Sequence, residues 1–185
     1  MEVETGRASA TTSTVSERTG RVQLPREIAE LNLISVAAKI RDHHRDWTET
    51  RIRAAVEGYR YFLALCKFEP ERPLVPAHDV DEVWHMHILF LEQYLADCQT
   101  VFGKVLYHYP YFGLQPEHAI RQYGAHLRDM LYLYRQYFGY VPPVYDGIED
   151  EIAEALATGI LTSERGLSGT MNLAHPANAR WYVPA

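Results

Sequence analysis

The stretch DVDEVWHMHIL, residues 79–89, contributes most to predicting the fold of this 185-residue chain, because it combines helix-start signals with several metal-ligand side chains. Asp79 is a residue type that often caps a helix, and Glu82 follows at the spacing of a capping box. We therefore expect a helix from about Val80 to Phe102. The histidine-rich stretch would occupy the first two turns of this helix.

The sequence on either side of this stretch predicts more helices and almost no strand. Apolar residues recur at helical spacing in four further segments, namely 24–40, 49–66, 117–138 and 148–159. Thr48 is a suitable N-cap for the second of these segments, and Gly139 is a suitable end for the third. The predicted fold class is all-α, a compact bundle of about four to five helices with irregular N- and C-terminal tails.

The composition along the chain predicts one domain with two tails. Residues 1–21 are rich in Ser, Thr and Gly and have no apolar periodicity, so we expect a disordered leader. Residues 22–162 form the predicted single helical domain, and residues 163–185 an irregular tail. Because this tail contains the apolar cluster WYV at 181–183, we expect it to fold back onto the helices or to contact a partner.

The charge balance argues against nucleic acid as a partner, since 18 Lys and Arg side chains stand against 24 Asp and Glu. No apolar run approaches the ~18 residues needed to span a bilayer, and the N-terminus lacks the basic and apolar regions of a secretion signal. We therefore expect no membrane association and a cytoplasmic location. Cys66 and Cys98 both fall in predicted helices, and we expect them to be reduced thiols.

The residues around the histidine stretch resemble those of a known family. The matching residues are the motif Asp-x-x-Trp-His-x-His at 81–87, together with Tyr59, Phe62, Leu63, Tyr94, Cys98, Phe102, Gly103, His108 and Pro110. Over roughly residues 33–143 the chain resembles the glycine-rich domain-containing protein-like family, a domain of unknown function found in small bacterial proteins and larger plant proteins. It departs from the family pattern at Tyr145, where a tryptophan is expected, and it carries no glycine-rich segment. The resemblance implies a fold and a histidine motif, and no known reaction.

The two histidines of the motif point in different directions on a regular helix. Each residue advances ~100°, so His85 and His87 lie about 200° apart and cannot both bind one ion. His87 shares an apolar stripe with Val80 and Leu91, which favours a buried, hydrogen-bonded histidine over a metal ligand. His85 follows Asp81 by four residues, a spacing that brings a carboxylate and an imidazole together on a helix surface.

The pair formed by Asp81 and His85 is the start of a predicted metal site. A carboxylate and an imidazole at this spacing can bind a divalent cation, or the carboxylate can fix the tautomer of the imidazole. His108 lies in the loop after the same predicted helix and would complete a 2-His-1-carboxylate set. The candidate metal ligands are therefore some subset of Asp81, His85, His87 and His108. The cofactor would be a divalent transition metal, for which iron, zinc and copper are all suited.

This site leads to a first hypothesis, a metal-dependent enzyme whose reaction is unknown and which is either an oxidoreductase or a hydrolase. The loop YHYPYFG would close over the ion, and Tyr107 or Tyr109 would border the substrate. Glu82 completes the candidate catalytic set, because it lies three residues before His85. The substrate would be a small or aromatic molecule or a peptide.

The second hypothesis is a non-catalytic helical protein-interaction module in which the motif is structural. Asp81 would then serve the helix dipole or a buried network with Trp84, and the histidines would hold helices together. The two hypotheses differ in the location of the histidines. If His85 and His87 are both fully buried, paired with protein acceptors and without a cleft beside them, the interaction module is favoured.

Overall fold

The computed structural model describes residues 21–109, 119–148 and 169–170. Its elements are α1 (Arg26–Ala29), α2 (Ile34–His43), α3 (Glu49–Phe68), α4 (His78–Leu89), α5 (Leu91–Phe102), β1 (His108–Tyr109), α6 (Ala119–Phe138), the 3-10 helix η1 (Pro143–Tyr145) and β2 (Gly169–Thr170). Within these residues the only sheet is the two-residue antiparallel pair of β1 with β2. The all-α class predicted from the sequence is therefore confirmed, as is the compact helical bundle.

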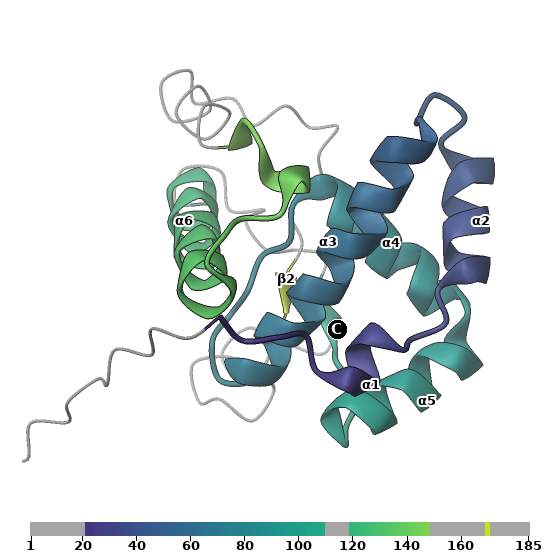
Figure 1. The fold of residues 1–185 in the computed structure, drawn as a ribbon, viewed down its shortest axis with the longest axis horizontal. Coiled ribbons are helices and arrows are strands. Elements are labelled where there is room, and N and C mark those ends of the chain that lie inside the picture. Colours follow the sequence, from purple (N-terminus) through teal and green to yellow (C-terminus); the bar gives the residue numbers. More distant parts are fainter. Residues whose placement is uncertain (1–20, 110–118, 149–168, 171–185) are drawn as a thin grey trace, which may run out of the picture.

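Helix α3 forms the centre of the core. Figure 1 shows it between α2 and α4 on one side and α6 on the other, and α3 packs against α1, α2, α4 and η1. The largest fully buried side chains include Tyr59 and Phe62 of α3, Trp84 of α4 and Tyr134 of α6. The rings of Phe62 and Trp84 lie 5.3 Å apart. The tryptophan of the motif is thus a core residue that holds α4 against α3.

The single helix predicted for residues 24–40 is instead two helices, α1 and α2. Between them, the side chain of Asn32 accepts the first backbone N–H of α2 at 3.2 Å, an alternative to helical pairing that this residue type favours. The guanidinium of Arg60 donates to the carbonyl oxygens of Ile28 and Leu31 at 2.6 and 2.8 Å. These two bonds provide partners for carbonyl groups at the interruption, where the oxygen of Ile28 also accepts a 3.3 Å bond from the backbone N–H of Leu31.

The helix predicted around the histidine motif is also broken, at Phe90, where the backbone leaves helical geometry with φ −87° and ψ 60°. The indole N–H of Trp84 donates to the hydroxyl of Tyr94 at 2.9 Å, and His87 donates to Asp97 at 3.1 Å. Each pair is ten residues apart, and ten residues of continuous helix rise about 15 Å. These two hydrogen bonds therefore require the bend that separates α4 from α5.

The capping box predicted for this region does not form. Helix α4 begins at His78, and Ala77 at its N-cap provides no side-chain hydrogen bond. Asp79 instead accepts two hydrogen bonds from Arg51 of α3, at 2.8 and 2.9 Å. Glu82 pairs with His44 at the C-terminal end of α2, at 2.9 Å. Both carboxylates serve contacts between helices rather than the helix start.

Other predicted helix ends are observed. The hydroxyl of Thr48 accepts the backbone N–H of Arg51 at 3.2 Å and caps α3. Helix α6 ends at Gly139, whose φ of 76° is costly for residues with a side chain. The predicted helix at 148–159 lies, beyond its first residue, outside the described residues. Residues 1–20 of the predicted leader and residues 171–185 of the tail also lie outside the described residues.

No helix among the described residues is both long enough and apolar enough to cross a membrane. Val22 is held against α6, because its backbone N–H donates to the carbonyl of Tyr137 at 2.7 Å.

Candidate metal centre

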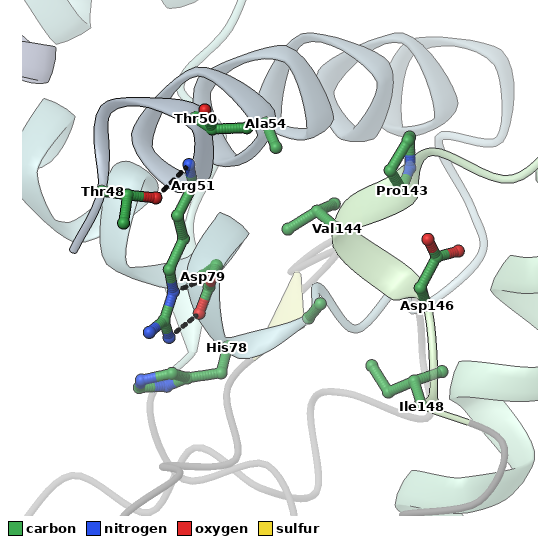
Figure 2. A pocket seen from close by; sticks show the side chains of 11 residues that line it. Thr48, Thr50, Arg51, Ala54, His78, Asp79, Pro143, Val144, Asp146 and Ile148 are labelled. Carbon is green, nitrogen blue, oxygen red and sulfur yellow. Dashed lines mark hydrogen bonds and ion pairs between the residues drawn. The ribbon is translucent and has the colours of Figure 1, made fainter.

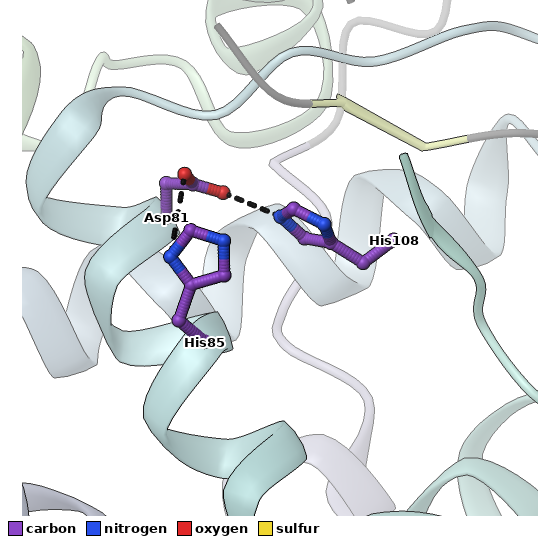
Figure 3. A group of neighbouring side chains, drawn as sticks. All are labelled: Asp81, His85 and His108. Carbon is purple, nitrogen blue, oxygen red and sulfur yellow. Dashed lines mark hydrogen bonds and ion pairs between the residues drawn. The ribbon is translucent and has the colours of Figure 1, made fainter. Parts of the chain in front are cut away.

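The structure brings together three of the four predicted metal ligands. Asp81 and His85 lie one turn apart on α4, and His108 reaches them from β1. The Nε2 atom of His108 donates to Oδ1 of Asp81 at 3.0 Å, and Nδ1 of His85 lies 3.7 Å from Oδ2. One ligand atom from each residue lies within 4.8 Å of the other two. Figure 3 shows both imidazole rings gathered around the single carboxylate.

The site is part buried and part open. The side chain of Asp81 is 4% exposed and that of His108 is 7% exposed, whereas that of His85 is 40% exposed. A carboxylate that is removed from water needs partners that favour its charged form, and the two imidazoles can provide them. His85 is the ligand that solvent or another molecule can reach.

His108 is held at the site by a hydrogen bond to the loop before it and by a contact of its own ring. The hydroxyl of Tyr94 on α5 donates to the carbonyl oxygen of Leu106, two residues before His108. The same hydroxyl accepts the indole N–H of Trp84. The ring of His108 also lies edge-on to that of Trp84, with 4.5 Å between the centroids. The bend between α4 and α5 therefore positions the loop that carries the third ligand.

Glu82, one of the predicted catalytic residues, lies beside the group. Its Oε1 atom is 3.8 Å from Nδ1 of His85, and its Oε2 atom accepts from Nε2 of His44 at 2.9 Å. These imidazoles lower the pKa of Glu82 to about 2, and Glu82 in turn raises the pKa of His85. A carboxylate with so low a pKa is a weak base, so Glu82 is better suited to an electrostatic role than to proton abstraction.

His87, the fourth predicted ligand, does not join the group. Its side chain is 2% exposed, and both ring nitrogens have protein partners: Nε2 donates to Asp97, and Nδ1 accepts from the hydroxyl of Tyr59 at 3.0 Å. Burial lowers the pKa of His87, which keeps the ring neutral as this pattern of one donor and one acceptor requires. The sequence favoured this core position for His87 over a ligand position.

The structure describes the side chain of Tyr107, but only the backbone of Tyr109, among the two tyrosines predicted to border a substrate. The side chain of Tyr107 is exposed and directly precedes His108. Tyr109 is placed by its backbone, which pairs with Gly169 of β2. An open depression of about 460 Å³ lies nearby, between the starts of α3 and α4 and η1 (Figure 2). Asp79 lines it, whereas Asp81, His85 and His108 do not.

The geometry of the three ligands would suit a metal ion if His85 moved closer to the other two. Two ligands at about 2.1 Å from one ion are about 3.0–3.5 Å apart in octahedral or tetrahedral geometry. The 3.0 Å between Nε2 of His108 and Oδ1 of Asp81 already meets this requirement. The ligand atom of His85 lies within 4.8 Å of the other two and would have to move closer. Binding would require His108 to give up the proton that it now shares with Asp81. Three protein ligands would leave further coordination positions open.

Comparison with known proteins assigns the chain to a family. A family model described as UCP032817-like matches residues 28–135, more than half of the chain. The chain belongs to the UCP032817-like family. Two Arabidopsis thaliana proteins, glycine-rich domain-containing proteins 1 and 2, are 43% and 39% identical to it over 61 residues. This confirms the family resemblance predicted from the sequence.

The UCP032817-like chain corresponds to only a small part of these plant proteins. The aligned region covers 31% of this chain, but 7% of glycine-rich domain-containing protein 1 and 8% of protein 2. No solved structure matches the chain. The matched region of residues 28–135 includes all three clustered ligands.

Sequence reasoning missed the residues that support the site from other helices. His44 follows the end of α2, and its side chain extends to Glu82. Asp97 was not identified either, and Tyr59 was identified as part of the family resemblance but not as a partner of His87. The contact between His44 and Glu82 joins residues 38 positions apart, so no local spacing could have indicated it.

Proposed function

We propose that this UCP032817-like chain binds a divalent transition metal through Asp81, His85 and His108 and acts as a metal-dependent enzyme. The observation that carries the proposal is the convergence of one buried carboxylate and two imidazoles, whose ligand atoms lie within 4.8 Å of one another. A 2-His-1-carboxylate set suits iron, and two imidazoles also suit zinc or copper. The ion would supply Lewis-acid chemistry at its open coordination positions.

The surroundings of the group support a role beyond structure. A structural zinc site usually has four protein ligands, whereas a catalytic site keeps a position open. His85 is accessible, and Tyr107 is exposed beside His108, so a small or aromatic substrate could approach from this side. His87 would support the site from the core, because its bonds to Tyr59 and Asp97 hold the last turn of α4 in place.

The interaction module remains the second candidate, and the buried part of the motif favours it. Trp84 and His87 are fully buried and hydrogen bonded to protein groups, as a structural motif would be. The condition set for this candidate is nevertheless met by His87 alone, since the side chain of His85 is only partly buried and its Nδ1 atom lies 3.7 Å from its nearest carboxylate oxygen. In this case the bond between His108 and Asp81 would be a structural pair without an ion.

Metal content separates the two candidates. Protein purified without an affinity tag should contain a transition metal by elemental analysis, or take up about one equivalent of Zn²⁺ or Fe²⁺ on titration. His85→Ala and His108→Ala should each lose this metal. His43→Ala, which removes an exposed histidine outside the group, should retain it. Less than about a tenth of an equivalent in the parent protein, with no uptake on titration, would reject the metal site.

A further inference from the structure

Glu82 has an unusual position next to the metal group, because its two oxygens face histidines from different helices. Oε2 accepts from His44 of the connection after α2, at 2.9 Å, and Oε1 faces His85 on α4, at 3.8 Å. The side chain of Glu82 is 18% exposed and that of His44 is 20% exposed. The pair is thus largely covered, and it is not a surface contact between flexible side chains.

The position of His44 is fixed by contacts that lead back to α4. Its ring stacks on that of Trp47, with 4.4 Å between centroids and 24° between planes. The guanidinium of Arg51 lies over this Trp47 ring, 4.1 Å from its centroid, in a cation–π contact. Arg51 also donates twice to Asp79 in the first turn of α4, as Figure 2 shows. The connection between α2 and α3 is therefore held against the same helix that carries Asp81 and His85.

The orientation of His85 needs such a partner. Its Nδ1 atom faces both carboxylates, at 3.7 Å from Asp81 and 3.8 Å from Glu82. Figure 3 shows the other ring nitrogen on the side toward His108. An oxygen of Asp81 already serves His108, and Asp81 would become a ligand when an ion binds. Glu82 would then be left to accept the proton on Nδ1 of His85.

We propose that Glu82, held by His44, is the positioning residue for His85. On ion binding it would move within hydrogen-bond distance of the Nδ1–H of His85, whose nitrogen now lies 3.8 Å away, and so leave Nε2 free to bind the ion. This inference rests on the proposed metal site. Metal-ligating histidines commonly donate their second N–H to a carboxylate, which fixes the tautomer and makes the ligand nitrogen more basic. The region around His44 and Trp47 thereby influences metal affinity without contributing a ligand.

The test measures binding of Co²⁺ as a spectroscopic probe, and of Zn²⁺ by competition, to the full chain. Glu82→Met removes the acceptor and should weaken binding about 10–100-fold, the usual effect of losing an outer-sphere partner. Glu82→Gln retains an acceptor oxygen and should recover part of this loss. His44→Ala leaves the acceptor in place but unsupported, so it should weaken binding about 10-fold. The absorption bands of bound Co²⁺ should keep their positions in all three variants, because the ligands are unchanged.

The control changes the same type of side chain elsewhere. Glu30→Gln disrupts an exposed ion pair with Arg26 and should bind as the parent does. Thermal unfolding of the metal-free variants shows that each is folded at the temperature of the titration.

Three results would overturn the inference, and they can be told apart. If the parent protein binds neither Co²⁺ nor Zn²⁺, the metal site itself fails and the positioning role fails with it. If the parent binds metal but Glu82→Met and His44→Ala each bind it as tightly as the parent does, the metal site stands and the positioning role is wrong. If Glu82→Met shifts the Co²⁺ bands, or Glu82→Gln is no better than Glu82→Met, Glu82 acts as a ligand or through its charge alone.

Discussion

Replacing His87 with alanine tests whether this histidine stabilises the core, in contrast to His85, which we propose as a metal ligand. The substitution removes a side chain that is 2% exposed, and truncations of buried side chains of this size cost about 2–3 kcal/mol at the low end of the observed range. It also leaves the fully buried hydroxyl of Tyr59 without its partner, which adds about 1–3 kcal/mol. Asp97 is partly exposed, so water can replace its lost bond. We expect a total loss of about 3–6 kcal/mol in the free energy of unfolding.

Urea unfolding followed by circular dichroism measures this loss. In thermal unfolding the midpoint should fall by on the order of 10 °C, since chains of this size lose about 2–4 °C per kcal/mol. Tyr59→Phe alone should cost about 1–2 kcal/mol, because it leaves Nδ1 of His87 unpaired. In the double variant the two costs should fall short of additivity by about 1–2 kcal/mol. His43→Ala is the matched control, with an expected change within about 0.5 kcal/mol because the residue is exposed.

The reasoning would be refuted by His87→Ala with an unfolding free energy within about 1 kcal/mol of the parent, or by strict additivity in the double variant. The first result would mean that the core tolerates both the cavity left by His87 and the unpaired hydroxyl of Tyr59. The second would mean that Tyr59 and His87 do not depend on each other.

Three other substitutions have distinct expected outcomes. His85→Ala should abolish metal uptake in titration calorimetry while changing the unfolding free energy by less than about 1 kcal/mol, since its side chain is partly exposed. Tyr94→Phe removes the donor to the carbonyl of Leu106, so it should cost about 1–2 kcal/mol in urea unfolding and also weaken Zn²⁺ binding by loosening the ligand loop. Gly58→Ala should destabilise, because its new Cβ would lie 2.5 Å from Cγ1 of Val144; unfolding midpoints should show that Val144→Ala restores stability in the double variant.

The sequence predicted those parts of the fold that depend on residues close together in the chain. The cap at Thr48 and the end of α6 at Gly139 are local features, and both are observed. The one-turn pairing of Asp81 with His85 is also a local feature of helix geometry. His108 was predicted as the third ligand from its place in the loop after the motif helix, and the structure places it in the group.

The errors have one physical cause, which is competition from tertiary contacts. Asp79 and Glu82 have the spacing of a capping box, but Arg51 and His44 offer these carboxylates charged or hydrogen-bonding partners from other helices. The continuous helix predicted after Asp79 is broken at Phe90, where the local sequence has neither proline nor glycine. The hydrogen bonds that accompany the bend join residues ten positions apart, which the period of a continuous helix does not bring together, so the helical pattern did not indicate the bend.

The bend at Phe90 also has a consequence for the order of folding. The contacts that it creates, from Trp84 to Tyr94 and from His87 to Asp97, span only ten residues each. Closing short loops costs little chain entropy, so we expect this corner to form early and largely by itself. The contact between Asp81 and His108 spans 27 residues and depends on the finished corner. An ion held there would therefore slow unfolding more than it speeds folding. Its main effect would be a longer lifetime of the folded state.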